Sequence, residues 1–98
     1  MTLKKFMPAG GGDTVTLAAA TTSARAALDP TSNAVRVVND GTVTAFISFG
    51  DSNVAATASK MPIKAGATEV FTKGNATHVA ALVATGTANL YFTSGEGI

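Results

Sequence analysis

The sequence has no cysteine and no tryptophan, and it holds one histidine, one tyrosine and three prolines among 98 residues. Without cysteine no disulfide can form, and one histidine cannot supply the ligands of a structural zinc site. Charged residues are scarce as well, at 13%, where about 25% is usual for a soluble domain. With a net charge of +1, the chain has no basic patch of the kind that binds nucleic acid. No segment approaches the ~20 consecutive apolar residues of a membrane-spanning helix, so we expect no membrane partner.

The apolar residues of the chain provide little bulk for a core. Hydrophobic residues make up 46% of the sequence, but many of them are alanine and only five are phenylalanine. Each buried alanine removes far less apolar surface from water than a leucine or phenylalanine does. The length indicates one domain with a modest core. We therefore expect the chain to gain stability as a homo-oligomer or by binding to a larger protein surface.

Residues 1–13 predict a flexible, glycine-rich arm that precedes the domain of residues 14–98. Pro8 and the run Gly10-Gly11-Gly12 leave the backbone of the arm unsuited to a packed core. Lys4 and Lys5 are not followed by an apolar stretch, so the arm does not predict a secretory signal. Two interpretations remain open, a disordered tail or an arm that becomes ordered on a neighbouring subunit.

Short alternating segments separated by turn residues predict an all-β protein. The predicted strands are Thr14–Ala19, Ser23–Leu28, two strands within Val35–Gly50, an edge segment around Pro62, Ala67–Thr72, His78–Ala84 and Ala88–Thr93, followed by a tail at Ser94–Ile98. The spacing of the turns is typical of a small antiparallel β-sandwich or barrel. His78–Ala84 is apolar on both faces and predicts a central strand that is covered on both sides.

The segment Val35–Gly50 predicts a β-hairpin, and the length of its turn decides which residues share a face. A two-residue loop at Asp40-Gly41 would place apolar residues on both faces. A three-residue loop, with Gly41 in the left-handed region, gives one apolar face, and the pattern favours this register. The predicted core face holds Val35, Val37, Val43, Ala45, Ile47 and Phe49. The opposite face holds Arg36, Thr42, Thr44 and Ser48, together with two apolar exceptions, Val38 and Phe46.

The residues that could carry chemistry occur in contexts that a structural role explains. Gly10-Gly11-Gly12 precedes Asp13 and a strand, whereas a phosphate-binding loop needs a following Lys-Ser/Thr and a helix. His78 opens an apolar strand, and a strand-end histidine is a poor catalytic base without an oriented acid partner. Asp51-Ser52-Asn53 lacks the further carboxylates of a calcium loop and predicts a turn. We therefore predict no catalytic, cofactor-binding or metal-binding residue and no enzyme activity.

What remains as a candidate site is the surface, because apolar residues on a polar face mark a place where a partner binds. Val38, Phe46 and Tyr91 project from faces that are otherwise polar, and Phe71 shares a side with Glu69. An equally reasonable alternative is that a loop or the second sheet covers these side chains. The predicted protein interface also includes Arg36 on the polar face and three residues of the arm, Lys4, Lys5 and Phe6.

Five blocks of the sequence, VRVVNDGT, FGDSNVAAT, MPIKAGATEVF, THVAAL and GTANLYFTSGEG, span residues 34–97. They resemble small all-β proteins encoded among the structural genes of tailed bacteriophages, some of which are capsid cement or decoration proteins. The resemblance implies a β-sandwich of the jelly-roll kind that sits on a virion, and it carries no catalytic residue to this chain.

From the residues and this resemblance together we expect a non-enzymatic virion protein that binds the major capsid protein or other virion proteins and stabilises the head shell. Its expected location is the capsid surface, and the host cytoplasm during assembly. Two alternatives stay open. One is a head–tail or tail component, and the other is a glycan-recognition module of a phage fibre in which Tyr91 stacks on a sugar.

Overall fold

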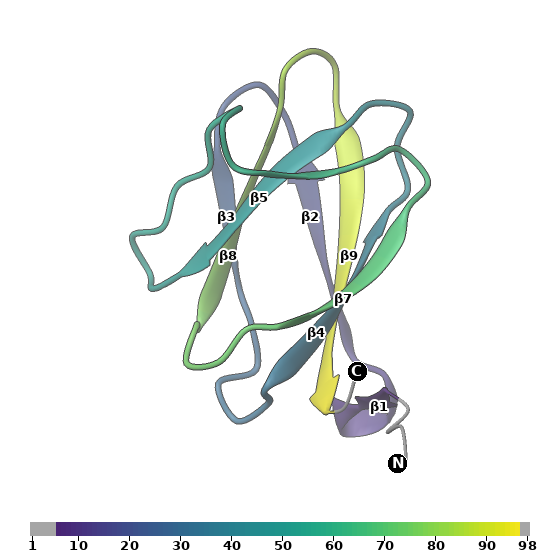
Figure 1. Ribbon diagram of the computed structural model, residues 1–98, viewed down its shortest axis with the longest axis vertical. Coiled ribbons are helices and arrows are strands. Elements are labelled where there is room, and N and C mark those ends of the chain that lie inside the picture. The colour runs from purple at the N-terminus through teal and green to yellow at the C-terminus, as the bar shows by residue number, and fades with distance from the viewer. Residues whose placement is uncertain (1–5, 97–98) are drawn as a thin grey trace.

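The computed structural model describes residues 6–96 and consists of two antiparallel β-sheets that face each other (Figure 1). These residues form nine strands and one turn of 3-10 helix, η1 (Ala9–Gly11). The strands are β1 (Met7–Pro8), β2 (Thr14–Ala19), β3 (Ala24–Ala27), β4 (Ala34–Asn39), β5 (Ala45–Gly50), β6 (Met61–Ile63), β7 (Thr68–Thr72), β8 (His78–Val83) and β9 (Ala88–Glu96). The predicted all-β sandwich is confirmed. Within residues 6–96 no helix has the length and apolarity to span a membrane.

The order of the strands is that of a jelly roll. In sheet A, β9 pairs with β1 and β2 on one side and with β4 on the other, and β7 lies outside β4. Sheet B has the order β3-β8-β5-β6. Strands therefore pair from the two ends of the chain inward, β2 with β9, β3 with β8, β4 with β7 and β5 with β6. One long antiparallel ribbon, folded over into two sheets, produces this arrangement.

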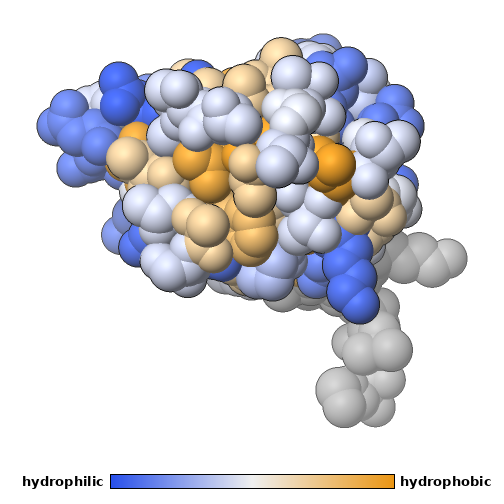
Figure 2. Space-filling view, turned by 90° about the horizontal axis from the view of Figure 1, so that it is seen from above, coloured by the Kyte–Doolittle hydropathy of each residue, from blue (hydrophilic) through white to orange (hydrophobic). Residues whose placement is uncertain are grey.

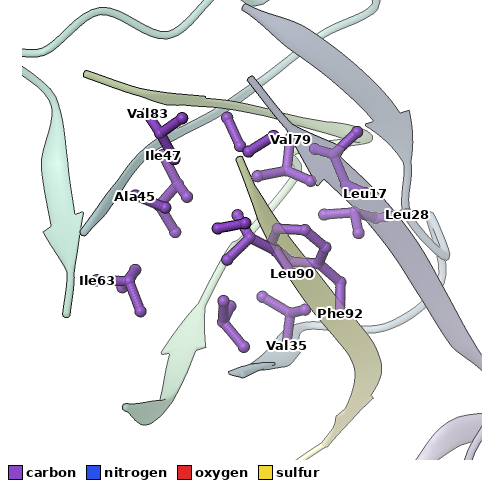
Figure 3. Packing of buried hydrophobic residues seen from close by; sticks show 14 residues of the cluster. Leu17, Leu28, Val35, Ala45, Ile47, Ile63, Val79, Val83, Leu90 and Phe92 are labelled. Carbon is purple, nitrogen blue, oxygen red and sulfur yellow. The ribbon is translucent and has the colours of Figure 1, made fainter. Parts of the chain in front are cut away.

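The core lies between the sheets and is built from the alternate residues that each strand turns inward (Figure 3). Its largest fully buried side chains are aliphatic apart from Phe92 and Asn39, and they include Val35, Val37, Ile47, Ile63, Val79, Val83 and Leu90. Alanines 19, 45, 81 and 88 fill much of the remaining space. Few large side chains are therefore available to stabilise the contact between the sheets, as the composition predicted.

The predicted hairpin over Val35–Gly50 is wrong. The two strands exist, but β4 pairs with β7 and β9 in sheet A, whereas β5 pairs with β6 and β8 in sheet B. Residues 40–44 cross from one sheet to the other. Gly41 is not in the left-handed region. A Cβ atom at this position would lie 2.5 Å from Cβ of Ala88, so close packing against β9 accounts for the glycine.

Asn39, at the end of β4, stabilises the crossing of residues 40–44, and its polar side chain is fully buried. Its Nδ2 donates hydrogen bonds to the carbonyl oxygens of Val43 at 3.0 Å and Ile63 at 2.9 Å. Its Oδ1 accepts a bond of 2.9 Å from the backbone N–H of Gly41. A buried amide that satisfies three backbone groups links the end of β4 to the crossing and to β6.

The predicted core face is nevertheless confirmed. Val35, Val37, Ala45 and Ile47 are at most 1% exposed, and the two remaining members, Val43 and Phe49, pack against the core. Alternation along each strand sets which side chains point inward, whichever neighbour the strand pairs with.

The described part of the N-terminal arm lies on the domain itself. Met7 and Pro8 pair with Gly95 and Glu96, and this pairing extends β9 through the region that the sequence predicted to be a tail. A turn of 3-10 helix then leads into β2. Lys4 and Lys5 lie outside the described residues. Binding of the arm to a neighbouring subunit stays a prediction.

Candidate functional site: the outer face of sheet A

The candidate site is the outer face of sheet A, where two rows of side chains run across the four long strands. The upper row is Thr16, Tyr91, Val38 and Thr68, and the lower row is Thr14, Thr93, Arg36 and Val70, in the strand order β2-β9-β4-β7. Directly paired residues of an antiparallel sheet project to the same side. The pairing thus brings Arg36, Val38 and Tyr91, all predicted interface residues, onto one surface.

Threonine and valine predominate on this face because β-branched side chains pack well on a pleated surface that is half exposed. Thr14 and Thr93 share a hydrogen bond of 2.7 Å between their Oγ1 atoms, which ties β2 to β9. Tyr91 and Val38 are directly paired and half-buried. An aromatic ring beside a β-branched side chain is a favourable cross-strand pair, and it gives the face a semi-apolar centre.

Residues 6–8 lie along one end of this face. Phe6 and Pro8 border a depression of about 460 Å³ whose other lining residues are Gly12, Thr14, Arg36, Val70 and Thr93. Met7 and Phe6 can lie over β9 because Gly95 has no side chain. A Cβ atom there would collide with the backbone carbonyl of Met7 and would be 2.8 Å from the tip of the Phe6 ring. Phe6, predicted as an interface residue from its place in the arm, therefore joins Arg36 at the same surface.

Charge is almost absent from the outer face of sheet A. Among the eight residues of the two rows, Arg36 alone is charged, and it is exposed. Removing charged groups from water adds a large cost to burying a surface against a partner. Interfaces are accordingly poor in lysine and acidic residues but enriched in tyrosine and arginine. The composition of this face is therefore favourable for contact with another protein.

Phe46 lies on the other side of the molecule, so the prediction that it shares a face with Val38 is wrong. On the outer face of sheet B it stands between Pro62 of β6 and Leu82 of β8. The error follows from the hairpin, because strands of one hairpin share their outer face whereas strands in opposing sheets do not.

A long loop, residues 51–60, covers part of the outer face of sheet B. It reaches the first edge of the sheet, where the Ala56 N–H donates to Ser23 Oγ at 2.9 Å and Arg25 donates to the Val54 carbonyl at 3.4 Å. Ala80 projects to the outer side of β8 and yet is fully buried, as expected beneath a covering segment. Phe46 is half-buried. The sequence left open that a loop covers apolar residues on an outer face. This is the arrangement on part of the outer face of sheet B.

Phe71 is half-buried and does not lie on the outer face of sheet A, and its place in an interface stays a prediction. It pairs with Val35 on the inner side of sheet A and packs against the core. Its ring lies 5.9 Å from that of Phe49, centre to centre, at a tilt of 58°. Phe71 does share a side with Glu69 as expected, but Glu69 is exposed at the edge of the sheet.

The residue that the sequence-based prediction missed is Val70, which stands beside Arg36 on the outer face. The segment Thr-Glu-Val-Phe-Thr has adjacent apolar residues, so period-2 alternation leaves open which of the two points inward. Thr68 and Thr72 lie two residues before and after Val70, so all three side chains point to the same side of the strand. Because these two residues are polar, they could have indicated that Val70 points outward.

His78 and Asp29, two groups of the kind used in catalysis or metal binding, lie away from the two rows of this face. His78, on sheet B, has its Nδ1 2.9 Å from the hydroxyl of Thr77. Asp29 is engaged in its own turn, where it accepts hydrogen bonds from Thr31 and Ser32. In the described part of the chain, no group of three or more histidine or acidic side chains is placed to hold a metal ion.

Seen from the end that lies uppermost in Figure 1, the sandwich carries hydrophobic residues in small separate patches between polar ones (Figure 2). This end is made of the loops that join the strands. Small scattered patches are normal for a soluble protein surface and do not by themselves indicate a partner.

No protein family matches the chain, and no curated protein matches it. Among solved structures, one described as "Bacillus endospore appendages form a novel family of disulfide-linked pili" is similar to 97% of this chain and to 94% of its own length. The sequence identity is 20% and the TM-score is 0.46. No functional conclusion follows from a similarity of this size, so the function has to be argued from the surface of the protein.

Proposed function

We propose that the protein is a non-enzymatic structural component of a bacteriophage virion, a cement or decoration protein that binds the head shell through the outer face of sheet A. The observation that carries the proposal is the gathering of Phe6, Arg36, Val38 and Tyr91 on one nearly uncharged face. The phage origin is supported by the sequence blocks in residues 34–97 alone.

The physical properties of the domain suit such a role. The two rows of side chains on the outer face of sheet A include a single charged residue, Arg36, and can be covered at a low desolvation cost. A small jelly roll whose strands pair across the whole chain is a rigid body, and little conformational entropy is lost when a rigid body binds. If copies join in a homo-oligomer, as the thin core suggests, several faces bind one shell together and each contact need only be weak.

The proposal is tested by placing a charge in the centre of the face. Val38→Glu puts a carboxylate beside Tyr91, whereas Ala58→Glu puts the same charge on the exposed loop over sheet B. We expect Val38→Glu to bind at least about tenfold more weakly, a loss of about 1.4 kcal/mol, to phage particles that lack the protein. Ala58→Glu should bind like the wild type. Co-sedimentation of each purified variant with the particles measures both.

Equal occupancy of the particles by the Val38 variant and the wild type would exclude the outer face of sheet A as the binding surface. The role in the shell has an independent measurement, the number of copies per particle by quantitative mass spectrometry. Hundreds of copies are expected for a shell protein, whereas about six or twelve would place it on the symmetry axis of the tail. Absence from purified particles would overturn the proposal altogether.

A further inference from the structure

A second depression lies on the opposite side of the molecule, at the outer edge of sheet B. Its volume is about 490 Å³, and its lining residues are Ser23, Arg25, Ala26, Ala27, Ser52 and His78. Most of these belong to β3 or its approach, His78 opens the neighbouring strand β8, and Ser52 comes from the loop over the sheet. The site therefore has the edge of a sheet as one wall and a loop as the other.

The side chains around this depression are hydrogen-bond donors with spare capacity. The guanidinium of Arg25 has five N–H groups, and its bond to the Val54 carbonyl is long, at 3.4 Å. Ser23 Oγ accepts a hydrogen bond from Ala56, so its own O–H remains available to donate. When the Thr77 hydroxyl donates to Nδ1 of His78, the second ring nitrogen carries the proton and is a donor too.

The backbone of β3 adds further donors. Leu28 N–H donates a hydrogen bond of 2.8 Å to the carbonyl of Thr77, the residue before β8, and this bond shows which residues of β3 turn their backbone groups toward β8. Hydrogen bonding alternates along an antiparallel pair, so Ala26 turns its backbone groups toward β8 while Arg25 and Ala27 turn theirs outward. Since β3 is the outermost strand of sheet B, these two N–H groups face the open edge beside the depression.

No carboxylate is among the six lining residues, which instead bring together a guanidinium, an imidazole, two hydroxyls and edge amides. With no carboxylate in the lining, these donors can bind an oxyanion, and arginine binds a planar carboxylate with two parallel bonds. The carbonyl groups of Arg25 and Ala27, which turn to the same open edge, are acceptors for hydroxyl groups. The depression is open to solvent, and its volume of about 490 Å³ leaves room beside a bare anion. Because the lining is polar, hydroxyl groups rather than an apolar body fit the remaining space.

We propose that this depression binds an acidic saccharide, with the sugar carboxylate at Arg25 and the edge of β3 and the sugar hydroxyls toward Ser23, Ser52 and His78. The site is separate from the outer face of sheet A, so it adds a ligand to a protein whose proposed role is to bind protein. A domain with both sites attaches through one face and presents the other to the surroundings.

The experiment is a titration of the isotope-labelled protein, followed by its backbone amide signals in two-dimensional NMR, with glucuronate as the probe. Glucose serves as the neutral control and sulfate as the bare-anion control. We expect saturable shifts at the amides of Arg25, Ala27 and Ser52 with millimolar glucuronate, little response to glucose, and weaker binding of sulfate. Arg25→Gln should weaken glucuronate binding at least about tenfold, whereas Arg36→Gln, on the opposite face, should not change it.

The proposal is overturned if glucuronate causes no saturable shift at these three amides, or if Arg25→Gln binds it as tightly as the wild type does. Equal responses to glucose and glucuronate would show that the carboxylate does not contribute to binding. If sulfate binds as tightly as glucuronate, the sugar does not contribute to the affinity, and the depression is a site for simple oxyanions. Arg25→Lys keeps the charge but loses the two-pronged geometry, and an affinity between those of the wild type and Arg25→Gln is expected. The dispersion of each spectrum shows whether the variant is folded.

Discussion

Replacing Asn39 by alanine should cost the protein a large part of its stability, because this one side chain serves three backbone groups at the crossing between the sheets. The change removes the bonds from Nδ2 to the Val43 and Ile63 carbonyls and the bond from the Gly41 N–H to Oδ1. No other group takes their place, since alanine has neither donor nor acceptor in its side chain. The two carbonyls and the amide would then lose their partners in a region with limited access to water.

The size of the effect follows from the burial of each bond. The contact with Ile63 is buried, and a buried polar group without a partner costs roughly 1–3 kcal/mol. The contacts with Val43 and Gly41 are partly buried, and each is worth about 1 kcal/mol. The sum is about 3–5 kcal/mol. Domains of this size are stable by only about 5–15 kcal/mol, and a loss of about 4 kcal/mol lowers the melting temperature by roughly 15–30 °C.

Urea unfolding followed by circular dichroism measures the loss as a shift in the midpoint at an unchanged slope. Asn89→Ala is the matched control, because Asn89 is exposed on β9 of the same sheet, and its replacement should change stability by less than about 0.5 kcal/mol. Asn39→Asp is the sharper test. It keeps the acceptor for Gly41 but sets a carboxylate against the carbonyls of Val43 and Ile63.

We expect Asn39→Asp at neutral pH to be at least as unstable as Asn39→Ala. The reasoning is refuted if Asn39→Ala lies within about 1 kcal/mol of the wild type, or if the aspartate variant is as stable as the asparagine. Either result would mean that the geometry of the crossing is held by the strands and does not depend on this side chain.

Two further predictions concern acid and the start of the chain. The pKa of Asp29 is held below its ordinary value of 3.8 by the side-chain hydroxyl of Thr31, then by the backbone N–H of Thr31 and the hydroxyl of Ser32. The stabilising contribution of this turn is therefore complete above pH 3.8 and is lost as the pH falls through the lowered pKa. Urea midpoints measured from about pH 6 to about pH 2 should fall less steeply for Asp29→Asn than for the wild type, and identical slopes would contradict the assignment. Gly95→Val should displace the backbone carbonyl of Met7 and the ring of Phe6 from β9, and so expose the N-terminal segment to limited proteolysis while circular dichroism stays that of the wild type. Asn89→Val on the same strand should leave the cleavage rate unchanged, and a Gly95 variant as resistant as the wild type would show that the segment accommodates a side chain there.

Most of the strands could be predicted from the sequence because their inward residues alternate with period 2. Thr14–Ala19 coincides with β2, and His78–Ala84 marks the central strand β8 to within one residue. Pro62 correctly indicated an edge strand, since β6 is the last strand of sheet B. These features depend on local pattern and on the chemistry of single residues, which a sequence displays directly.

The partner of each strand could not be predicted in the same way. Val35 and Ile47 point into the same core whether β4 and β5 form a hairpin or stand in opposing sheets, so their alternation is compatible with both. What separates the two arrangements is contact between residues distant in the sequence, such as Gly41 against Ala88 and Asn39 with Ile63. The candidate site inherited this ambiguity. Val38 and Tyr91 were each predicted to point outward, as they do, whereas Phe46 was assigned to the wrong side of the sandwich.

The place of β9 between β2 and β4 also governs when the domain can fold. Neither of these strands has the other as a neighbour, so sheet A stays divided until residues 88–96 have emerged from the ribosome. Pairing between strands far apart in the sequence closes long loops and makes folding slow. During synthesis the nascent chain therefore carries unpaired strand edges, a condition that favours association with other unfinished chains. Copies of a chain with this topology therefore associate less when each is released and folded before it meets its neighbours.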